Sequence, residues 1–337
     1  MFDVLADTVI LATGDAIENT PTIRLISMLV VLAGGLFLGY LASNNFGMSE
    51  NYAKKIMTGV ILIFDWPVVL FVIWTLKLEF ELIWLPIAGV ILLFLITVLS
   101  VPISKMLKFD KKSKITFMLA ACLSNLGYTG GAFVCYALFG TTALAMANLY
   151  IVLWMPAAYF VFFPLLKFIE LRQYDPQIRF QMSHIFDLRY IALPAILAAL
   201  VLNISGIKQP EFIEDLHIVD FFIYTASALS FFAIGMRVKF SRFKNYINLY
   251  FLLAAVKFIL TPLVAFLIVY VFWLMGHSLE GPIRNVIVVM AVTPSAIMMV
   301  TMSNVFDLDS KMASALWVVN TAVFTFVVVP ILFFVFN

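Results

Sequence analysis

The stretch Ser124-Asn125-Leu126-Gly127-Tyr128-Thr129-Gly130-Gly131 lies at mid-depth in an apolar run that covers residues 115–139. It places three glycines and several small polar groups where a membrane helix would otherwise continue. A helix that is interrupted inside a bilayer frees backbone N–H and C=O groups, which lipid cannot satisfy. The stretch therefore predicts a broken membrane helix that faces protein or a water-filled cavity.

The composition of the whole chain supports a membrane fold. Of the 337 residues, 64% are apolar and only 12% are charged, whereas a soluble domain has about 25% charged residues. Spanning the hydrocarbon core takes about 20 helical residues, and barrel strands would show an alternation that is missing here. Ten runs qualify as spans. They are residues 22–43, 56–76, 82–104, 115–139, 142–168, 188–206, 217–237, 246–276, 283–304 and 311–336.

The distribution of Lys and Arg between the loops predicts the orientation. Alternate loops carry sixteen of these residues and the remaining loops carry four, with one more, Lys257, inside a run. The sixteen are Lys54, Lys55, Lys105, Lys108, Lys111, Lys112, Lys114, Lys167, Arg172, Arg179, Arg189, Arg237, Lys239, Arg242, Lys244 and Lys311, and the four are Arg24, Lys77, Lys208 and Arg284. The basic side is expected to be cytoplasmic, so ten spans place both termini outside a plasma or inner cell membrane. Residues 1–20 contain four acidic residues and no Lys or Arg, which predicts an extracytoplasmic segment rather than a signal peptide.

The basic stretch 170–187 divides the chain into two halves, residues 21–169 and residues 188–337, with five spans each. Because five is odd, the second half enters the membrane from the opposite side, which is the topology of an inverted repeat. Weak internal similarity agrees, since Phe139-Gly140 and Leu149-Tyr150 have the same spacing as Phe306-Asp307 and Leu316-Trp317.

A second interruption, Thr293-Pro294-Ser295, lies in the ninth run, at the position that corresponds to the fourth-run break. Half-helix ends that meet at the midplane offer N–H groups to an anion and carbonyl groups to a cation. The alternative is that the glycines only allow close helix packing. We expect the two breaks together to form a substrate site. Its predicted residues are Ser124, Asn125, Gly127, Thr129, Gly130, Gly131, Thr293, Pro294 and Ser295.

Two charged residues lie deep in predicted spans, Asp65 in the second and Lys257 in the eighth. Each costs about 2.5–3.5 kcal/mol on insertion scales, so each should face a partner or a cavity. The ammonium of Lys257 could occupy the place of a coupling cation, and burial favours its neutral form, which makes it a candidate proton carrier. Asp65 could bind a proton, pair with a neighbouring donor or face a second subunit. Asn320 in the tenth span also needs a partner, and Asn148 is its counterpart in the fifth.

Enzymatic chemistry has little support in the sequence. It contains no GxxxxGK[ST] phosphate loop and no HExxH motif. The two cysteines, Cys122 and Cys135, suggest neither a disulfide nor a metal site, and a single intramembrane aspartate cannot form an aspartyl protease dyad. We therefore expect no enzyme, no cofactor, no metal and no nucleic-acid partner.

The two breaks and a third motif resemble the auxin efflux carrier family. The first break followed by Leu138-Phe139-Gly140 is similar to its N-x-G-[FY]-x-G…FG stretch. The stretch from Ala228-Leu229 to Ile234-Gly235-Met236 is similar to its seventh-span pattern, and Ala291-Val292-Thr293-Pro294-Ser295-Ala296 to its ninth-span break.

This resemblance implies ten helices in a 5+5 inverted repeat, with crossing broken helices in spans 4 and 9. It also implies a scaffold of spans 1, 2, 6 and 7 and a mobile transport domain of spans 3–5 and 8–10. The family's bacterial members are usually taken as transporters of organic anions such as malonate or malate. One departure is Ala132, where the family usually has a proline shortly after the fourth-span glycines.

The resulting hypothesis is an all-α integral membrane protein that acts as a secondary transporter of a small organic anion. Coupling to protons is preferred to coupling to sodium, because Lys257 could replace the metal ion. The alternatives are a sodium-coupled symporter or cation/proton antiporter of a related ten-helix fold, and a ligand sensor with a transporter-like fold. A homodimer is left open.

Overall fold

The computed structural model describes residues 21–46, 50–107, 109–158, 192–236, 246–277, 279, 281–305 and 308–336. The expected N-terminal segment 1–20 and the expected linker 170–187 lie outside these residues. Within them the chain is all-helical apart from loops and one isolated β-bridge, Ser124 with Ser295. Apolar sequence without strand alternation forms helices in lipid because a helix satisfies its own backbone.

The first half of the chain contains seven described α-helices, one π-helical turn (η1) and one 3-10 turn (η2). They are α2 (Pro21–Phe46), α3 (Glu50–Val60), η1 (Ile61–Asp65), α4 (Trp66–Trp74), η2 (Phe80–Ile83), α5 (Trp84–Met106), α6 (Lys111–Cys122), α7 (Gly131–Phe139) and α8 (Thr141–Ala157). The second half also consists of α-helices with interspersed π-helical turns. Its elements are α10 (Ala192–Ile204), α11 (Phe212–Asp215), α12 (Ile218–Gly235), α13 (Ile247–Ala255), η7 (Val256–Leu260), α14 (Thr261–Leu274), α15 (Pro282–Ala291), α16 (Met298–Val305), α17 (Ser310–Val323), η8 (Phe324–Val328) and α18 (Val329–Phe336).

Six helical segments of the described chain are long and apolar enough to cross a membrane. They are Ile26–Phe46, Asn51–Trp74, Phe80–Met106, Ile218–Gly235, Ile247–Leu274 and Ser310–Phe336. Three shorter apolar helices accompany them, namely Thr141–Trp154, Pro194–Ile204 and Pro282–Ala291. The fourth and ninth predicted runs give short helices because each is interrupted, and parts of the fifth and sixth runs lie outside the described residues.

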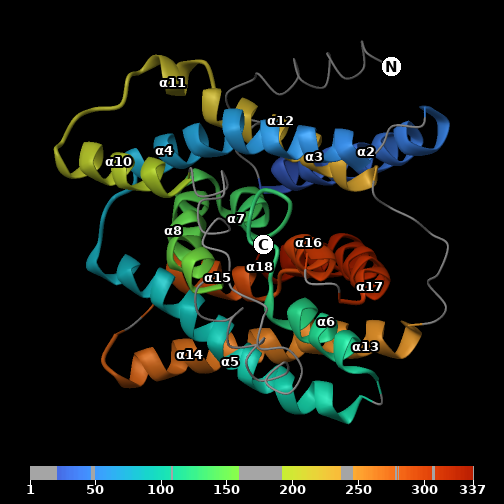
Figure 1. The fold of residues 1–337 in the computed structure, drawn as a ribbon. Helices are drawn as coiled ribbons and strands as arrows, with labels where there is room; N and C mark the ends of the chain where they lie inside the picture. Colours follow the sequence, from blue (N-terminus) through green and yellow to red (C-terminus); the bar gives the residue numbers. More distant parts are fainter. Residues whose placement is uncertain are drawn as a thin grey trace.

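One group of helices is formed by α2, α3, α4, α10 and α12, which lie together in the upper part of Figure 1. Helix α2 packs along α12, and α4 packs along α10. Glycines permit the close approach of the first pair. A Cβ at Gly39 would overlap the backbone of Phe232, and one at Gly235 would overlap the backbone of Leu36. Such small residues are the usual means of close helix packing where lipid removes the hydrophobic driving force.

The second group surrounds the two breaks. Helix α5 contacts α6, α8 and α14, and α15 contacts α7 and α8. Helix α17 contacts α6, α13 and α16. In Figure 1 this group fills the middle and lower parts of the view, with α5, α13 and α14 farthest from α2 and α12.

Three long segments contain a π-helical turn, and each turn ends two residues before a proline. The turns are η1, η7 and η8, and the prolines are Pro67, Pro262 and Pro330. Proline has no N–H and its ring clashes with the carbonyl four residues earlier, so the preceding turn widens. Asp65 is the last residue of η1 and Lys257 the second of η7, so both intramembrane charges lie in widened turns.

Candidate functional site

The two helix breaks lie directly against each other. The first separates α6, which ends at Cys122, from α7, which begins at Gly131. The second separates α15 from α16. Between them the backbones run antiparallel. The Asn125 N–H donates to the Pro294 carbonyl at 2.7 Å, and the Ala296 N–H donates to the Leu123 carbonyl at 2.9 Å. Each break therefore satisfies backbone groups that the other has freed, as burial requires.

The first break is held by its own asparagine. The Asn125 Nδ2 donates to the Thr129 carbonyl at 2.9 Å, and the Thr129 hydroxyl donates to Asn125 Oδ1 at 3.0 Å. The backbone carbonyl of Asn125 accepts the Gly131 N–H at 3.0 Å. Both polar atoms of the Asn125 side-chain amide are hydrogen-bonded within the loop. Together with the bond to the Gly131 N–H, they fix the point at which α7 begins.

The glycines of this break are required by space. A Cβ at Gly130 would overlap the Asn125 carbonyl oxygen, and one at Gly131 would lie 2.6 Å from Met290 Sδ. Around Gly127, by contrast, the position of a Cβ is open. Gly130 thus permits the tight turn of the first break, and Gly131 permits its close contact with the second break, which was the packing alternative, while Gly127 borders open space.

Ala132, where the resemblance leads one to expect proline, contributes a hydrogen bond that proline could not make. Its N–H donates to the Leu126 carbonyl at 2.8 Å. The chain starts α7 sharply without proline because Gly130 supplies the turn and Ala132 supplies the donor.

The second break is fully enclosed. The Thr293 hydroxyl donates to the Met290 carbonyl at 2.9 Å, and the Ser295 hydroxyl donates to the Ala120 carbonyl at 2.7 Å. Both residues have an exposed fraction of 0%. The Ser295 N–H donates to Asn320 Oδ1 at 2.8 Å, so Asn320 of α17 finds the partner that its depth demanded.

Lys257 lies beneath the first break with an exposed fraction of 0%. Its Nζ donates to the Ser124 hydroxyl oxygen at 2.6 Å and to the Ala121 carbonyl at 3.4 Å. Ala121 belongs to the last turn of α6, whose carbonyls have no further helix to bond and carry the negative end of the helix dipole. A cation is stabilised at this place, and in this chain the lysine supplies it.

Asp65, the other intramembrane charge, interacts with Tyr128 of the first break. Its Oδ1 is buried and has no hydrogen-bond partner in the described part of the chain. Its carboxylate is in electrostatic contact with Tyr128, whose carbonyl accepts the Ser227 hydroxyl of α12 at 3.1 Å. No ion pair joins Asp65 to Lys257 among the described side chains. The two charges are therefore separate features of the site.

Exposure distinguishes the predicted residues. Ser124, Asn125, Gly127 and Thr129 are partly exposed, whereas Gly130, Gly131 and all three residues of the second break are buried. In this conformation the first break presents its polar edge and the second break supports it from behind. Sequence reasoning did not find Ala120, Ala121 or Ser227, because two of these act through backbone carbonyls and the third is an ordinary small residue of a membrane helix.

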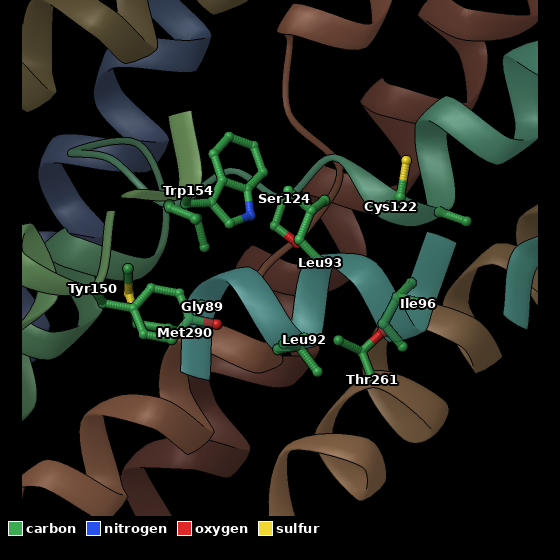
Figure 2. A pocket seen from close by; sticks show the side chains of 12 residues that line it. Gly89, Leu92, Leu93, Ile96, Cys122, Ser124, Tyr150, Trp154, Thr261 and Met290 are labelled. Atoms are coloured by element: carbon green, nitrogen blue, oxygen red, sulfur yellow. The ribbon is translucent and has the colours of Figure 1, made fainter. Parts of the chain in front are cut away.

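A small cavity of about 10 Å³ touches the first break. Ser124, Cys122, Tyr150, Trp154 and Thr261 line it together with apolar side chains of α5. Figure 2 shows Ser124 between the side chains of Trp154 and Leu93. The volume is close to that needed for one water molecule, so this cavity cannot hold an organic solute.

Two hydrogen bonds join the first break and α7 to α12. One is the bond from Ser227 to the Tyr128 carbonyl, and the other runs from the Tyr136 hydroxyl to Asp220 Oδ1 at 2.5 Å. Through these two side-chain hydrogen bonds the helix group around α12 contacts the group around the breaks. They matter because relative motion of the two groups would have to break them.

Comparison with known proteins identifies the family of the chain. No curated protein matches the chain closely. The family model described as membrane transport protein matches residues 24–332, which is nearly the entire chain and includes both breaks and both intramembrane charges. Members of this family are transporters, and the long apolar helices accord with a multi-pass membrane protein. The chain therefore belongs to the membrane transport protein family, the auxin efflux carrier family that its motifs resemble.

Proposed function

We propose that the protein is a secondary transporter of a small organic anion, a carboxylate, and that protons drive it. The observation that carries this proposal is the antiparallel contact of the two breaks with the buried Lys257 amine bonded beside it at Ser124. Broken helices at matching positions are the usual mark of a transporter site. A titratable cation at the freed carbonyls of α6 supports proton coupling, since a proton can be gained and lost there without a metal ion.

The architecture that we propose has ten spans in two inverted halves. Helix contacts support it, because they repeat when the halves are exchanged. The α2–α12 contact (spans 1 and 7) corresponds to the α4–α10 contact (spans 2 and 6), and α5–α8 (spans 3 and 5) corresponds to α13–α17 (spans 8 and 10). The basic loops then lie in the cytoplasm and both termini lie outside a cell membrane.

The helix group of α2, α3, α4, α10 and α12 is proposed to be the scaffold, and the group around the breaks to be the mobile domain. The glycine contacts between α2 and α12 support a rigid scaffold. The solute would bind at the partly exposed edge of the first break, where Ser124, Asn125 and Thr129 offer polar atoms. Alternating access then moves this edge from one side of the membrane to the other.

The test is uptake of radiolabelled malonate and malate into proteoliposomes, under a pH gradient, under a sodium gradient and with neither. We expect uptake to follow the pH gradient, to ignore sodium and to be inhibited by other small carboxylates. Lys257→Met should abolish the response to pH. Uptake that requires sodium would instead support the cation-coupled alternative, and binding without flux would support a sensor. Unchanged pH dependence in Lys257→Met would refute proton coupling through this residue.

A further inference from the structure

The Lys257 amine has no direct access to solvent. Its exposed fraction is 0%, and within the described chain it donates hydrogen bonds to Ser124 Oγ and to the Ala121 carbonyl. Ser124 is the partner that is partly exposed, and it also lines the cavity that has room for about one water. The hydrogen-bonded route from Lys257 to the polar edge of the break therefore runs through the Ser124 hydroxyl.

Hydrogen-bond chemistry gives this hydroxyl two orientations. An ammonium has three donors and no acceptor, so a charged Lys257 must donate to Ser124 Oγ and leaves the serine O–H to point elsewhere. A neutral amine has a lone pair, so it can accept the serine O–H instead. A charged Lys257 therefore always leaves the Ser124 O–H free to donate toward the cavity and the open edge, whereas a neutral Lys257 can accept that O–H.

We propose that Ser124 is a positioning residue that couples the protonation of Lys257 to anion binding by reversing one hydrogen bond. This inference rests on the proposed function and adds the residue through which the proton acts. With Lys257 charged, the Ser124 hydroxyl donates to an anion or to a water bound to the anion. The positive charge of Lys257 then lies one hydrogen bond away from Ser124, on the side opposite to the anion. With Lys257 neutral, both contributions are lost and the anion is released.

Among the residues that the structure describes, the groups neighbouring Lys257 do not offer a second hydrogen-bonded route. The Ala121 carbonyl can only accept, and the Ser295 hydroxyl is committed to the Ala120 carbonyl. The titratable group in electrostatic contact with Lys257 is the buried Cys122 thiol of α6. From α5, Thr97 and Ser100 face inward with hydroxyls that donate to carbonyls of their own helix, at 2.7 Å each. Helices α13 and α14 carry one tyrosine each, Tyr250 and Tyr270, and the side chain of Tyr270 is exposed.

The experiment has a part that needs no solute. The melting temperature of the purified protein is measured across the neutral pH range for the wild type, Lys257→Met, Ser124→Ala, Ser124→Thr and Ser100→Ala. The part of the pH dependence of the melting temperature that is missing in Lys257→Met is the contribution of Lys257. We expect this component to appear at the same pH as in the wild type in Ser124→Thr and in Ser100→Ala, which is the matched deletion of a hydroxyl. Ser124→Ala should displace it along the pH axis by about one to two units, because a hydrogen bond to a charged group is worth about tenfold or more.

The second part measures malonate uptake and proton uptake in the same vesicles. Ser124→Ala should lower the number of protons carried per malonate and flatten the pH profile, while Ser124→Thr and Ser100→Ala should match the wild type. Should Ser124→Ala not fold, Ser124→Cys serves, because a thiol is a weaker donor and acceptor and should give an intermediate displacement.

The outcomes separate this inference from the proposed function. If wild-type vesicles take up no carboxylate, the proposed function fails, while the melting series still decides whether Ser124 and Lys257 are linked. If Ser124→Ala melts and transports with the pH profile of the wild type, the inference is overturned although the protein remains a transporter. A displaced melting profile with an unchanged proton-to-malonate ratio also overturns it, since the bond would then be structural only.

Discussion

Removing the hydroxyl of Tyr136 should loosen the hold of α12 on the helices around the breaks. The Tyr136 hydroxyl donates to Asp220 Oδ1 at 2.5 Å and links α7 to the first turn of α12. Hydrogen bonds to charged groups are worth about 1.5–3 kcal/mol. Because the Asp220 side chain is 39% exposed, solvent screens the interaction. We therefore assign this hydrogen bond a stabilising free energy of about 1–2 kcal/mol. Tyr136→Phe should therefore raise the population of separated conformations by about five- to thirtyfold.

Hydrogen–deuterium exchange measures this population directly, because amides exchange from opened states. The amides of α7 and of the first turn of α12 should exchange faster in Tyr136→Phe by that factor, while those of α5 should not change. Tyr270→Phe is the matched control, since it removes a phenol hydroxyl from the exposed face of α14.

A double-mutant cycle with Asp220→Asn assigns the effect to this one bond. The two single substitutions should be strongly non-additive, because either one already breaks the charge-assisted bond. If α7 exchanges at the wild-type rate in Tyr136→Phe, or if the two effects simply add, then Tyr136 and Asp220 do not hold the two helix groups together.

Three further substitutions test the fold and the site. Gly39→Leu should push α2 away from the backbone of Phe232 and destabilise the folded protein, which a lower melting temperature would reveal. Ala132→Pro should lose the hydrogen bond to the Leu126 carbonyl and cost about 1–3 kcal/mol of stability, and a melting temperature equal to that of the wild type would contradict this. Asn320→Leu should leave a buried backbone N–H without an acceptor, and faster amide exchange confined to the second break would be the sign of it.

The positions of the helix breaks could be predicted from the sequence because their cause is local. Clustered glycines, or a proline flanked by small polar residues, weaken a helix locally, and an apolar run shows such a cluster without any knowledge of its neighbours. The need for partners at Lys257 and Asn320 could be predicted for a similar reason, since lipid offers none. The widened turns before Pro67, Pro262 and Pro330 have an equally local origin, although the sequence interpretation did not include them.

The identity of the partners depends on tertiary packing, which no local pattern reports. Nothing near Ser295 in the sequence indicates that its hydroxyl meets the Ala120 carbonyl, 175 residues earlier. The same holds for Lys257 and Ser124, which are 133 residues apart. Backbone carbonyls are the least predictable partners, because every residue has one and only the end of a helix makes it available.

The unequal exposure of the two breaks follows from this difference in partners. The serine and threonine of the second break are hydrogen-bonded to carbonyls and enclosed by α6 and α17, so in this conformation they hold the backbone in place. At the first break, Asn125 and Thr129 bond to each other and leave an edge partly exposed. An inverted repeat would make the two breaks equivalent, yet Lys257 lies under only one of them. Under the proposed function, in which Lys257 acts through Ser124, this asymmetry would place the anion at the first break and leave the second break as its support.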